Sequence, residues 1–340
     1  MKAVGLTRYL PIEDSESLLD LELPVPKASG HDLLIRIHAI AVNPVDTKVR
    51  KPKDKVETAS KVLGWDASGE VVAAGADCSL FKAGDRVYYA GDITRPGSNA
   101  EYQLVDERIV GHMPQSSSFE QAAALPLTAI TAWESLFDRL GISQDLAKNR
   151  GKSLLIIGGA GGVGSIAIQL ACKIAGLTVV ATASRSETTH WVKELGAHYV
   201  INHRQDLMPQ MAAIDLSQVD YILCANDTDA YFNIMAELIK PQGHICSIVE
   251  TTKPVNLDLL KNKSVAFVWE MMFTRAMYQT ADMLEQHHIL DRVAELVDAG
   301  TLKTTVNEVL SPINAANLRI AHAQLEAGTT IGKIVLSGWN

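Results

Sequence analysis

The pattern of apolar and polar positions changes near residue 122. Before it, short runs rich in β-branched and aromatic residues alternate with clusters of Gly, Pro and Asp; they include LLIRIHAIAV, SGEVVAAG, DRVYYAG and AEYQLV. Such runs are typical of strands joined by turns. The first part of the chain is therefore predicted to form a mostly antiparallel, barrel-like domain.

From about Ala122 helical and strand-like segments alternate. Helical periodicity in segments such as GGVGSIAIQLACKIAG and AYFNIMAELI is interleaved with the strand-like runs SLLIIGG, TVVATAS, YVINH, VDYILCAN, GHICSIVE and SVAFVWEMMF. Strands that alternate with helices imply βαβ units and a parallel sheet. The sequence therefore predicts an α/β fold with a Rossmann-type, doubly wound parallel sheet of six strands.

After residue 274 this alternation stops. One long helix is predicted over about 282–300, and the chain closes with the strand-like run GKIVLSG. These last pieces are expected to complete the first domain, so we assign residues 1–122 and 275–340 to it and residues 123–274 to the parallel-sheet domain. The polar stretch Gln144 to Lys152 is the candidate linker.

Composition places the chain among globular proteins. Its 340 residues exceed what one core usually accommodates, and 47% of them are hydrophobic and 21% charged. A net charge of −8 gives no general attraction to nucleic acid or anionic lipid. The N-terminus lacks the apolar segment of a secretory signal, and the four cysteines are widely spaced. A cytoplasmic protein without nucleic-acid or membrane partners is expected.

A glycine-rich turn, GGAGGVG, follows the strand-like run 153–157. It contains the GxGxxG spacing between a strand and a helix, and a second strand ends about 20 residues later. Such glycines permit a tight turn and a close approach of the backbone to a pyrophosphate at the helix N-terminus. The alternative is a turn that serves packing alone. The candidate cofactor contacts here are Gly159, Gly161, Gly162, Val163 and Gly164.

The end of the second strand indicates which dinucleotide binds. NAD enzymes usually place an acidic residue there, whereas this chain has Ser184 and Arg185. A hydroxyl and a guanidinium suit the 2′-phosphate of NADPH, which we predict as the cofactor. Ser184 and Glu187 also match a capping box, which would leave Arg185 solvated. Both roles are compatible.

Taken together, these segments resemble the medium-chain dehydrogenase/reductase superfamily, in particular its zinc-free quinone oxidoreductase branch. The likeness covers nearly the whole chain and rests on the segments AVNPVDTKVR, GWDASGEV, AGDRVYYAG, AALPLTAITAW, GGAGGVGSIAIQLA and GKIVL, in that order. The resemblance implies a GroES-like, mostly β catalytic domain beside the Rossmann domain, with the cofactor in the cleft. It also implies a homodimer that pairs through the run Val265 to Phe273.

The resemblance also implies that no metal is bound. Zinc-dependent relatives carry Cys where this chain has Asn43, and Gly-His-Glu where it has Gly64-Trp65-Asp66. A catalytic zinc needs about three nitrogen, sulfur or oxygen ligands from the protein. Trp65 is expected to fill the former metal site.

Several site residues follow from the resemblance alone. Asn43 matches an amide beside the nicotinamide ribose and the substrate, where it would orient the cofactor and donate to the developing oxyanion; a turn residue of the Asn-Pro pair is the alternative. Asp46 would anchor the same loop or act only as a cap. Thr131 matches a nicotinamide contact or a helix threonine bonded within its own turn. His203 and Asn226 complete the candidate cofactor contacts.

Two tyrosines are candidate proton donors. Tyr88 and Tyr89 follow a strand expected to border the cleft, and either phenol would deliver a proton; packed tyrosines are the alternative. Hydride addition to a quinone or an enone leaves a delocalised charge that needs no metal. We therefore expect an NADPH-dependent quinone or enone reductase. A non-catalytic NADPH-binding protein and a zinc-type alcohol dehydrogenase are the alternatives.

Overall fold

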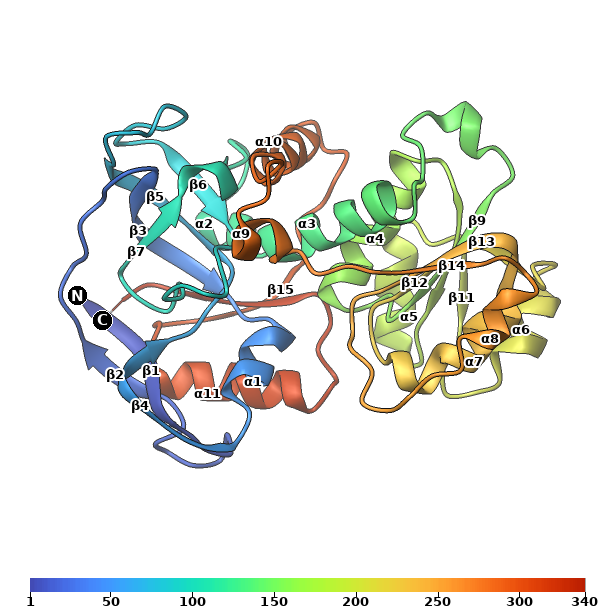
Figure 1. Cartoon of the computed structure of the whole chain (residues 1–340), viewed down its shortest axis with the longest axis horizontal. Coiled ribbons are helices and arrows are strands. Elements are labelled where there is room, and N and C mark those ends of the chain that lie inside the picture. The colour runs from blue at the N-terminus through green and yellow to red at the C-terminus, as the bar shows by residue number, and fades with distance from the viewer. Residues whose placement is uncertain (340) are drawn as a thin grey trace. The chain divides into compact units, whose positions relative to one another are not determined.

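The computed structural model describes residues 1–339, which form two compact units. Unit 1 comprises Met1–Leu127 and the chain from Phe273 onward, and unit 2 comprises Thr128–Met272 (Figure 1). The first boundary lies a few residues beyond residue 122 because helix α2 (Phe119–Ala123) packs on strands of unit 1. The second lies at Met272, close to the expected position at residue 274.

Unit 2 contains a six-stranded sheet in which every neighbouring pair of strands is parallel. The strand order is β11-β10-β9-β12-β13-β14. The strands are β9 (Ser153–Ile157), β10 (Thr178–Thr182), β11 (Tyr199–Ile201), β12 (Val219–Cys224), β13 (Ile239–Ser247) and β14 (Ala266–Trp269). The order starts at β9 and proceeds outward in both directions, so the predicted Rossmann-type, doubly wound sheet is confirmed.

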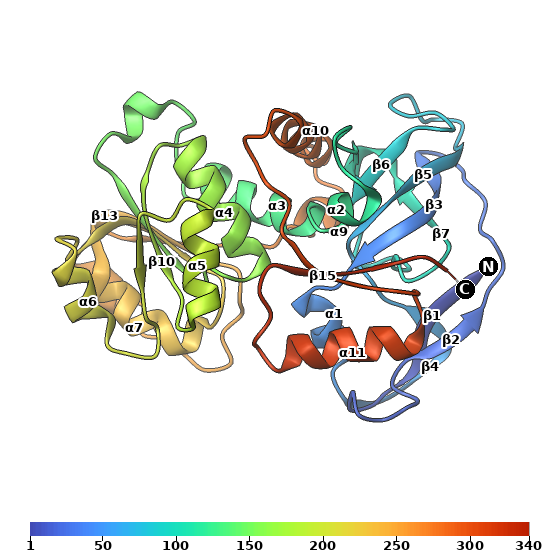
Figure 2. The same ribbon diagram turned by 180° about the vertical axis from the view of Figure 1, so that it is seen from behind.

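Helices cover both faces of this sheet. Helices α4 (Gly162–Lys173) and α5 (Ser186–Glu194) lie in front of it in Figure 2, where α4 contacts β9 and β10. Helices α6 (Leu207–Ala213), α7 (Thr228–Leu238) and α8 (Asp258–Lys261) follow in the chain, and α7 contacts β12 and β13. All residues of β9 are buried, as expected for a parallel strand covered on both faces.

The expectation that residues 144–152 form a linker is wrong. They lie within unit 2 and contain the 3₁₀ turn η3 (Leu146–Asn149). The side chain of Asn149 is buried, and its Nδ2 donates to the carbonyl oxygens of Ser143 at 2.6 Å and Ala175 at 2.8 Å. Polar composition suggested a linker, but these hydrogen bonds anchor the segment.

Unit 1 is built from two sheets. The smaller has the order β2-β1-β4 and is antiparallel; its strands are β1 (Lys2–Tyr9), β2 (Leu19–Glu22) and β4 (Lys53–Val62). The larger has the order β15-β16-β3-β5-β6-β8, and β7 also pairs with β3. Its strands are β3 (Asp32–Ala41), β5 (Ala67–Ala74), β6 (Arg86–Tyr89), β7 (Tyr102–Asp106), β8 (Val110–His112), β15 (Val306–Leu310) and β16 (Lys333–Ser337).

The C-terminal segment completes the larger sheet. Strand β16 pairs antiparallel with β3, with Val335 opposite Ala41, whereas β15 and β16 are parallel. The GroES-like, mostly antiparallel domain predicted from the sequence is therefore confirmed, and it is discontinuous in the chain.

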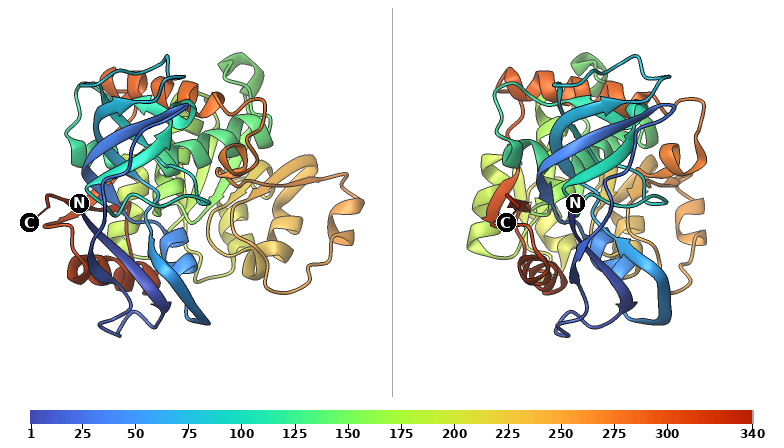
Figure 3. Two further views of the ribbon diagram at one scale, coloured as in Figure 1. Left: turned by 60° about the vertical axis from the view of Figure 1, so that its left-hand side comes forward. Right: turned by 90° about the vertical axis from the view of Figure 1, so that its left-hand side faces the viewer.

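Helices of unit 1 lie on both sides of its strands. Helix α10 (Glu285–Asp298) and helix α11 (Ala315–Glu326) flank them in Figures 1 and 3. The shorter helical segments are α1 (Pro44–Arg50), η1 (Glu107–Ile109), α2 and α9 (Thr274–Tyr278). Helix α3 (Pro126–Trp133) begins in unit 1 and continues past the unit boundary into a π-helical turn, Glu134–Arg139. Among residues 1–339 there is no helix long and apolar enough to cross a membrane.

Polar contacts hold α10 against strand β8. The Asp291 carboxylate accepts from the backbone N–H of His112 at 2.8 Å and lies 3.1 Å from its Nδ1. The hydroxyl of Tyr88 donates to the carbonyl oxygen of Leu290 at 2.6 Å. The carboxylate of Asp298 caps the segment after β8. The position of α10 therefore depends in part on a contact between a carboxylate and a histidine.

We predict that Asp291→Asn removes the pH-dependent part of this contact. The hydrogen bond that the His112 imidazole donates to the Asp291 carboxylate is the main cause that raises the pKa of His112. Its contribution to stability is thus complete below the unfolded pKa of about 6.5 and is lost as pH rises through the higher folded value. The difference in thermal unfolding midpoint between wild type and variant should be larger at about pH 5.5 than at about pH 8.

Asp298→Asn is the matched control. Its backbone contacts to Gln115 and Ser116 do not involve a histidine, and its pKa is lowered below its ordinary value. Its effect on the midpoint should be equal at both pH values. An equally pH-independent effect of Asp291→Asn would contradict the prediction.

Candidate functional site

The glycine-rich turn of unit 2 connects β9 to α4. Gly158 has a φ of +89°, and its N–H donates to Thr182 Oγ1 at 2.9 Å. A Cβ atom on Gly164 would lie 2.3 Å from the Gly158 carbonyl oxygen, and one on Gly159 would lie 2.9 Å from Ala181 Cβ. Glycine at these positions therefore lets the strand, the turn and the helix approach each other directly.

Gly161 is not explained by this packing. A Cβ atom there would have its nearest neighbour, the Gly158 carbonyl oxygen, at 3.6 Å, which is ordinary van der Waals contact. Gly161 is the N-cap of α4, whose first N–H groups have no intrahelical partners. A residue without a side chain leaves these groups open to an anion. Packing explains Gly159 and Gly164 but not Gly161, so Gly161 stays a predicted contact of the cofactor.

The turn lies where the strand order reverses. β9 has β10 on one side and β12 on the other, and ligands of such sheets bind at the carboxyl ends of the strands at this point. Asn226 follows β12, and its Cβ would lie 3.3 Å from a Cβ on Gly158. Asn226 and the predicted glycines therefore lie together. Thr131 is buried on α3, and its predicted nicotinamide contact stays a prediction.

Ser184 and Arg185 follow β10, but the capping box expected from Ser184 and Glu187 is wrong. Helix α5 begins at Ser186 with Arg185 as its N-cap. The Arg185 N–H donates to Thr188 Oγ1 at 3.0 Å. Thr188 therefore takes the place in the capping box that was expected for Glu187, because the helix begins one residue later than the sequence suggested.

His203 lies near two guanidinium groups. Burial lowers its pKa, and the charges of Arg204 and Arg185 lower it further. Among the residues that the structure describes, His203 Nδ1 is a buried atom without a hydrogen-bond partner. Two guanidinium groups near the imidazole make this part of unit 2 locally positive, which suits an anion. Arg204 was not among the residues predicted from the sequence.

In unit 1, Asn43 belongs to a buried polar network. Its Nδ2 donates to Asp66 Oδ2 at 2.9 Å and approaches the carbonyl oxygen of Trp65 at 3.3 Å. The ammonium of Lys333, which begins β16, donates to Asn43 Oδ1 and to Asp66 Oδ2, the latter at 2.7 Å. Asp66 Oδ1 accepts from the N–H of Leu127 at 2.8 Å. All three side chains of this network, Asn43, Asp66 and Lys333, are at most 3% exposed.

Asp46 joins the network through the backbone. Its Oδ2 accepts from the N–H of Asn43, the N-cap of α1, at 2.6 Å. Burial raises the pKa of Asp46 to about 7, while the Asn43 N–H and the Lys333 charge lower it. Burial also raises the pKa of Asp66, and Lys333 again opposes this effect. The ammonium of Lys333 contacts Asp66 and acts on Asp46 through its charge, so it opposes the effect of burial on the pKa of both carboxyl groups.

The tyrosine hydroxyls point into the interior of unit 1. Tyr89 donates to Gln103 Oε1 at 2.9 Å and Tyr88 donates to Leu290, and both side chains are fully buried. Burial raises the pKa of both phenols. These contacts are those of packed tyrosines, which was the alternative to a role in proton transfer. The role of Tyr89 as a proton donor stays a prediction.

These residues do not fit a zinc ion. Asn43 Oδ1 and Asp66 Oδ2 both accept from the ammonium of Lys333, so a cation of the protein already lies against them. Trp65 is fully buried, and its Nε1 donates to the carbonyl oxygen of Asp92 at 3.3 Å. Within residues 1–339 no group of three or more His, Cys, Asp or Glu side chains is arranged to hold a metal.

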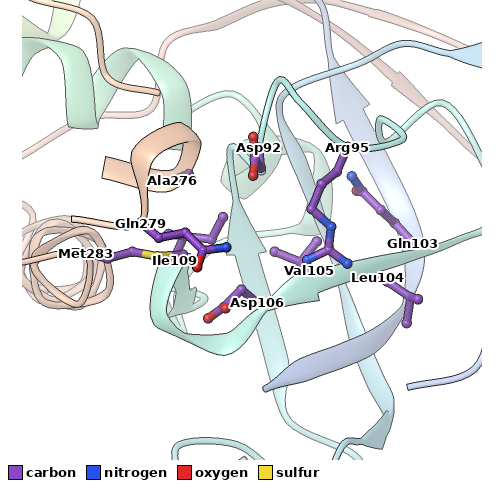
Figure 4. Close-up of a pocket in the computed structure, with 10 residues that line it drawn as sticks. All are labelled: Asp92, Arg95, Gln103, Leu104, Val105, Asp106, Ile109, Ala276, Gln279 and Met283. Carbon is purple, nitrogen blue, oxygen red and sulfur yellow. The ribbon is translucent and has the colours of Figure 1, made fainter. Parts of the chain in front are cut away.

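Two cavities occur elsewhere in unit 1. One has a volume of about 30 Å³, which accommodates about one water molecule. In Figure 4, Gln279 and Met283 border it from one side and Arg95 and Gln103 from the other. The second is an open, mostly apolar groove of about 480 Å³, bordered by Leu23, Val62, Ile93, Ala100 and Leu104 among others. Asn43, Asp46 and Tyr89 do not line either cavity.

Lys333 is the main site residue that the sequence reasoning missed. Its only signal is a charged residue between Gly332 and the apolar run IVL. Lysines in such positions are mostly solvated, so a buried lysine could not be expected from the sequence.

Two family models match the chain. The model of an alcohol dehydrogenase GroES-like domain matches residues 29–126, and the model of a zinc-binding dehydrogenase matches residues 195–336. A zinc-type alcohol dehydrogenase-like protein of Staphylococcus aureus (strain COL) is 46% identical over 337 residues, which cover 99% of this chain and 100% of the relative.

Solved structures show the same fold. A protein from Rhizobium etli CFN 42, named as a candidate zinc-dependent alcohol dehydrogenase, matches with a TM-score of 0.95 and 51% identity, covering 100% of this chain and 98% of that chain. The quinone oxidoreductase from Coxiella burnetii matches with a TM-score of 0.81 and 27% identity, covering 100% and 99%.

Gly161 and Gly164 should respond differently to substitution. Gly161→Val should leave the thermal unfolding midpoint nearly unchanged, because the fold has room for a Cβ atom there, and should abolish dinucleotide binding, because a branched side chain would block the expected approach of the pyrophosphate. Gly164→Ala should destabilise the fold by about 1–3 kcal/mol through overpacking. Calorimetric melting and a dinucleotide titration measure the two effects. Unchanged dinucleotide affinity in Gly161→Val would mean that the phosphates bind elsewhere.

Proposed function

Because this chain belongs to the medium-chain dehydrogenase/reductase superfamily and is an oxidoreductase with a nicotinamide cofactor, we propose that it reduces quinones or α,β-unsaturated carbonyls with NADPH and without zinc. The observation that carries this proposal is the network of Asn43, Asp66 and Lys333. By the resemblance, Asn43 stands where zinc-dependent relatives carry a cysteine, and its Oδ1 accepts from the ammonium of Lys333, as does Asp66 Oδ2.

The kind of acceptor follows from the charge on the substrate that this network is able to stabilise. Reduction of an isolated carbonyl places charge on one oxygen, and enzymes stabilise it with a metal or a well-placed donor. A quinone or an enone spreads the charge over several atoms, so hydrogen bonds and a proton from water suffice. The Coxiella burnetii neighbour is named a quinone oxidoreductase, which supports the same class of acceptor.

Residues of unit 2 are suited to hold the cofactor. NADPH, when bound, supplies the hydride. The N-terminus of α4 behind Gly161 would receive the pyrophosphate. Arg185, Arg204 and His203 would receive the 2′-phosphate, because the two cations and the unpartnered imidazole nitrogen lie at the ends of β10 and β11. No acidic side chain occupies residues 183–186 to favour NAD.

Two proposals about site and assembly remain. Asn43, Asp46 and Tyr89 stay predicted catalytic residues, with Asn43 also predicted to contact the cofactor. The homodimer also stays a prediction: β14 is the edge strand of its sheet, and its Trp269 is 46% exposed.

Turnover assays test the proposal directly. The purified protein should oxidise NADPH in the presence of a quinone or a short enone, and EDTA should not change the rate, because the network has no ligand set for zinc. Activity that EDTA removes and zinc restores would establish a zinc-type alcohol dehydrogenase instead. NADPH binding without turnover across the panel of acceptors would favour a non-catalytic binding protein.

Cofactor choice gives a sharper prediction. Arg185→Ala removes a charge-assisted contact to the 2′-phosphate worth about 1.5–3 kcal/mol, so the dissociation constant for NADPH should rise by about one to two orders of magnitude. NADH has no phosphate there and should bind nearly as before. Equilibrium titrations with both cofactors measure this ratio.

Arg150→Ala is the matched control, because Arg150 is an exposed arginine of unit 2 that follows η3, away from β10 and β11 in sequence. It should leave both dissociation constants unchanged. Equal, small changes for the two cofactors in Arg185→Ala would refute the assignment of the 2′-phosphate.

A further inference from the structure

The orientation of the Asn43 carboxamide is set by its partners. A carboxamide has one acceptor end and one donor end, whereas an ammonium only donates and a carboxylate only accepts. The carboxamide atom of Asn43 that faces the Lys333 ammonium must therefore be Oδ1, and the atom that faces the Asp66 carboxylate must be Nδ2. A rotated carboxamide would place its NH₂ group against the ammonium and its oxygen against the carboxylate. The two charged neighbours thus permit a single orientation.

The other buried cations among the described residues, Arg50 and Arg275, have different partners; Nε of Arg275 donates to Asp282 at 3.0 Å. Arg50 lies on α1, close in sequence to Asn43, and is 1% exposed. Its guanidinium donates to the carbonyl oxygen of Leu10 at 2.6 Å, to His322 Nδ1 at 3.3 Å and to Glu326. Its charge is therefore directed at α11, whereas the ammonium of Lys333 contacts Asp66.

The sheet fixes where the ammonium lies. The backbone N–H of Lys333 donates to the carbonyl oxygen of Thr305 at 2.8 Å, and the N–H of Val42 donates to that of Ile334 at 3.1 Å. The start of β16 is therefore held beside the end of β3, where the chain turns into Asn43. With its backbone so anchored and its side chain 3% exposed, Lys333 has little freedom to reach other partners.

We infer that Lys333 is a positioning residue of the site: its ammonium fixes the carboxamide of Asn43 and the carboxylate of Asp66 in the arrangement that the reaction requires. The step to the reaction rests on the proposed function. The geometric part rests only on the contacts among these three side chains. Lys333 acts through Asn43 and Asp66, and no contact between Lys333 and a substrate is invoked.

The test compares three variants. Lys333→Met removes the charge and the donor while keeping an apolar stem, and Lys333→Arg keeps both. Lys82→Met is the control, because Lys82 is an exposed lysine of unit 1 whose ammonium pairs with Asp85. Melting curves first establish that each variant is folded. Lys333→Met should lower NADPH-dependent turnover by about 10- to 100-fold, Lys333→Arg should restore most of it, and Lys82→Met should match wild type.

The pH profile separates positioning from a general loss of structure. Lys333 lowers the pKa of Asp46 and of Asp66, so its removal should move the apparent pKa near 7 upward by about one to three units. The comparison is made over the pH range in which melting curves show both proteins to be folded, so that unfolding does not change the shape of the profile. An apparent pKa that is the same in wild type and Lys333→Met, or turnover in Lys333→Met equal to wild type, would overturn the inference.

A measurement of stability does not depend on turnover, so it tests the role of Lys333 separately from the proposed function. The folded pKa of Asp46 lies above its unfolded value of about 3.8, so this group's contribution to stability is present at low pH and is lost as pH rises to about 7. In Lys333→Met this loss should extend to higher pH by the same one to three units. If Lys333→Met does not fold, Lys333→Gln, which keeps a donor without the charge, should show the same shift.

Wild-type protein without turnover would refute the proposed function and leave this stability test intact. A stability profile that does not move in the neutral variant would refute the role of Lys333.

Discussion

The buried contact between the Lys333 ammonium and the Asp66 carboxylate constrains the part of unit 1 that carries the candidate reaction site. Taking two charges out of water costs several kcal/mol each, and only short contacts with further hydrogen bonds offset that cost. Asp66 meets this condition, because it accepts from Lys333, from Asn43 and from the backbone of Leu127. Removing one partner of such a pair costs about 3–5 kcal/mol, since the other charge stays buried. The start of β16, the turn after β3 and the start of β5 are therefore fixed together.

The glycine turn of unit 2 shows two different constraints within a few residues. Gly159 and Gly164 are required by the fold, because a Cβ atom at either position would meet neighbouring atoms at 2.9 Å and 2.3 Å. At Gly161 the nearest atom would lie at 3.6 Å, so the fold by itself tolerates a side chain there. The fold and the ligand site therefore share one sequence motif without depending on the same residues. In unit 1 the fold and the candidate site are not separate in this way, because the candidate site residue Asn43 is hydrogen-bonded to both members of the buried ion pair, Asp66 and Lys333.

The sequence could predict what depends on local patterns. Strand and helix periodicity identified all six parallel strands, and the glycine spacing identified the turn at β9. Contacts between distant segments could not be predicted in this way: Lys333 lies 290 positions from Asn43 and 267 from Asp66, and nothing near Lys333 in the sequence signals burial. Local chemistry also misled where two partners competed, as at α5, where Thr188 rather than Glu187 pairs with the N-cap. The segment 144–152 looks like a linker by composition, but the buried Asn149 contradicts this.

A lysine and a zinc ion differ in a way that bears on the proposed reaction. A metal can take the lone pair of a substrate carbonyl as an additional ligand. An ammonium only donates hydrogen bonds, and two of the three that Lys333 can make are directed at Asn43 Oδ1 and Asp66 Oδ2. This network is therefore poorly suited to stabilise charge localised on a single substrate oxygen. A conjugated acceptor spreads that charge over its own atoms. A quinone or an enone therefore does not need the stabilisation of a localised charge that this network is poorly suited to supply. Under the proposed function, the ammonium beside Asn43 and the choice of a conjugated acceptor therefore share one physical cause.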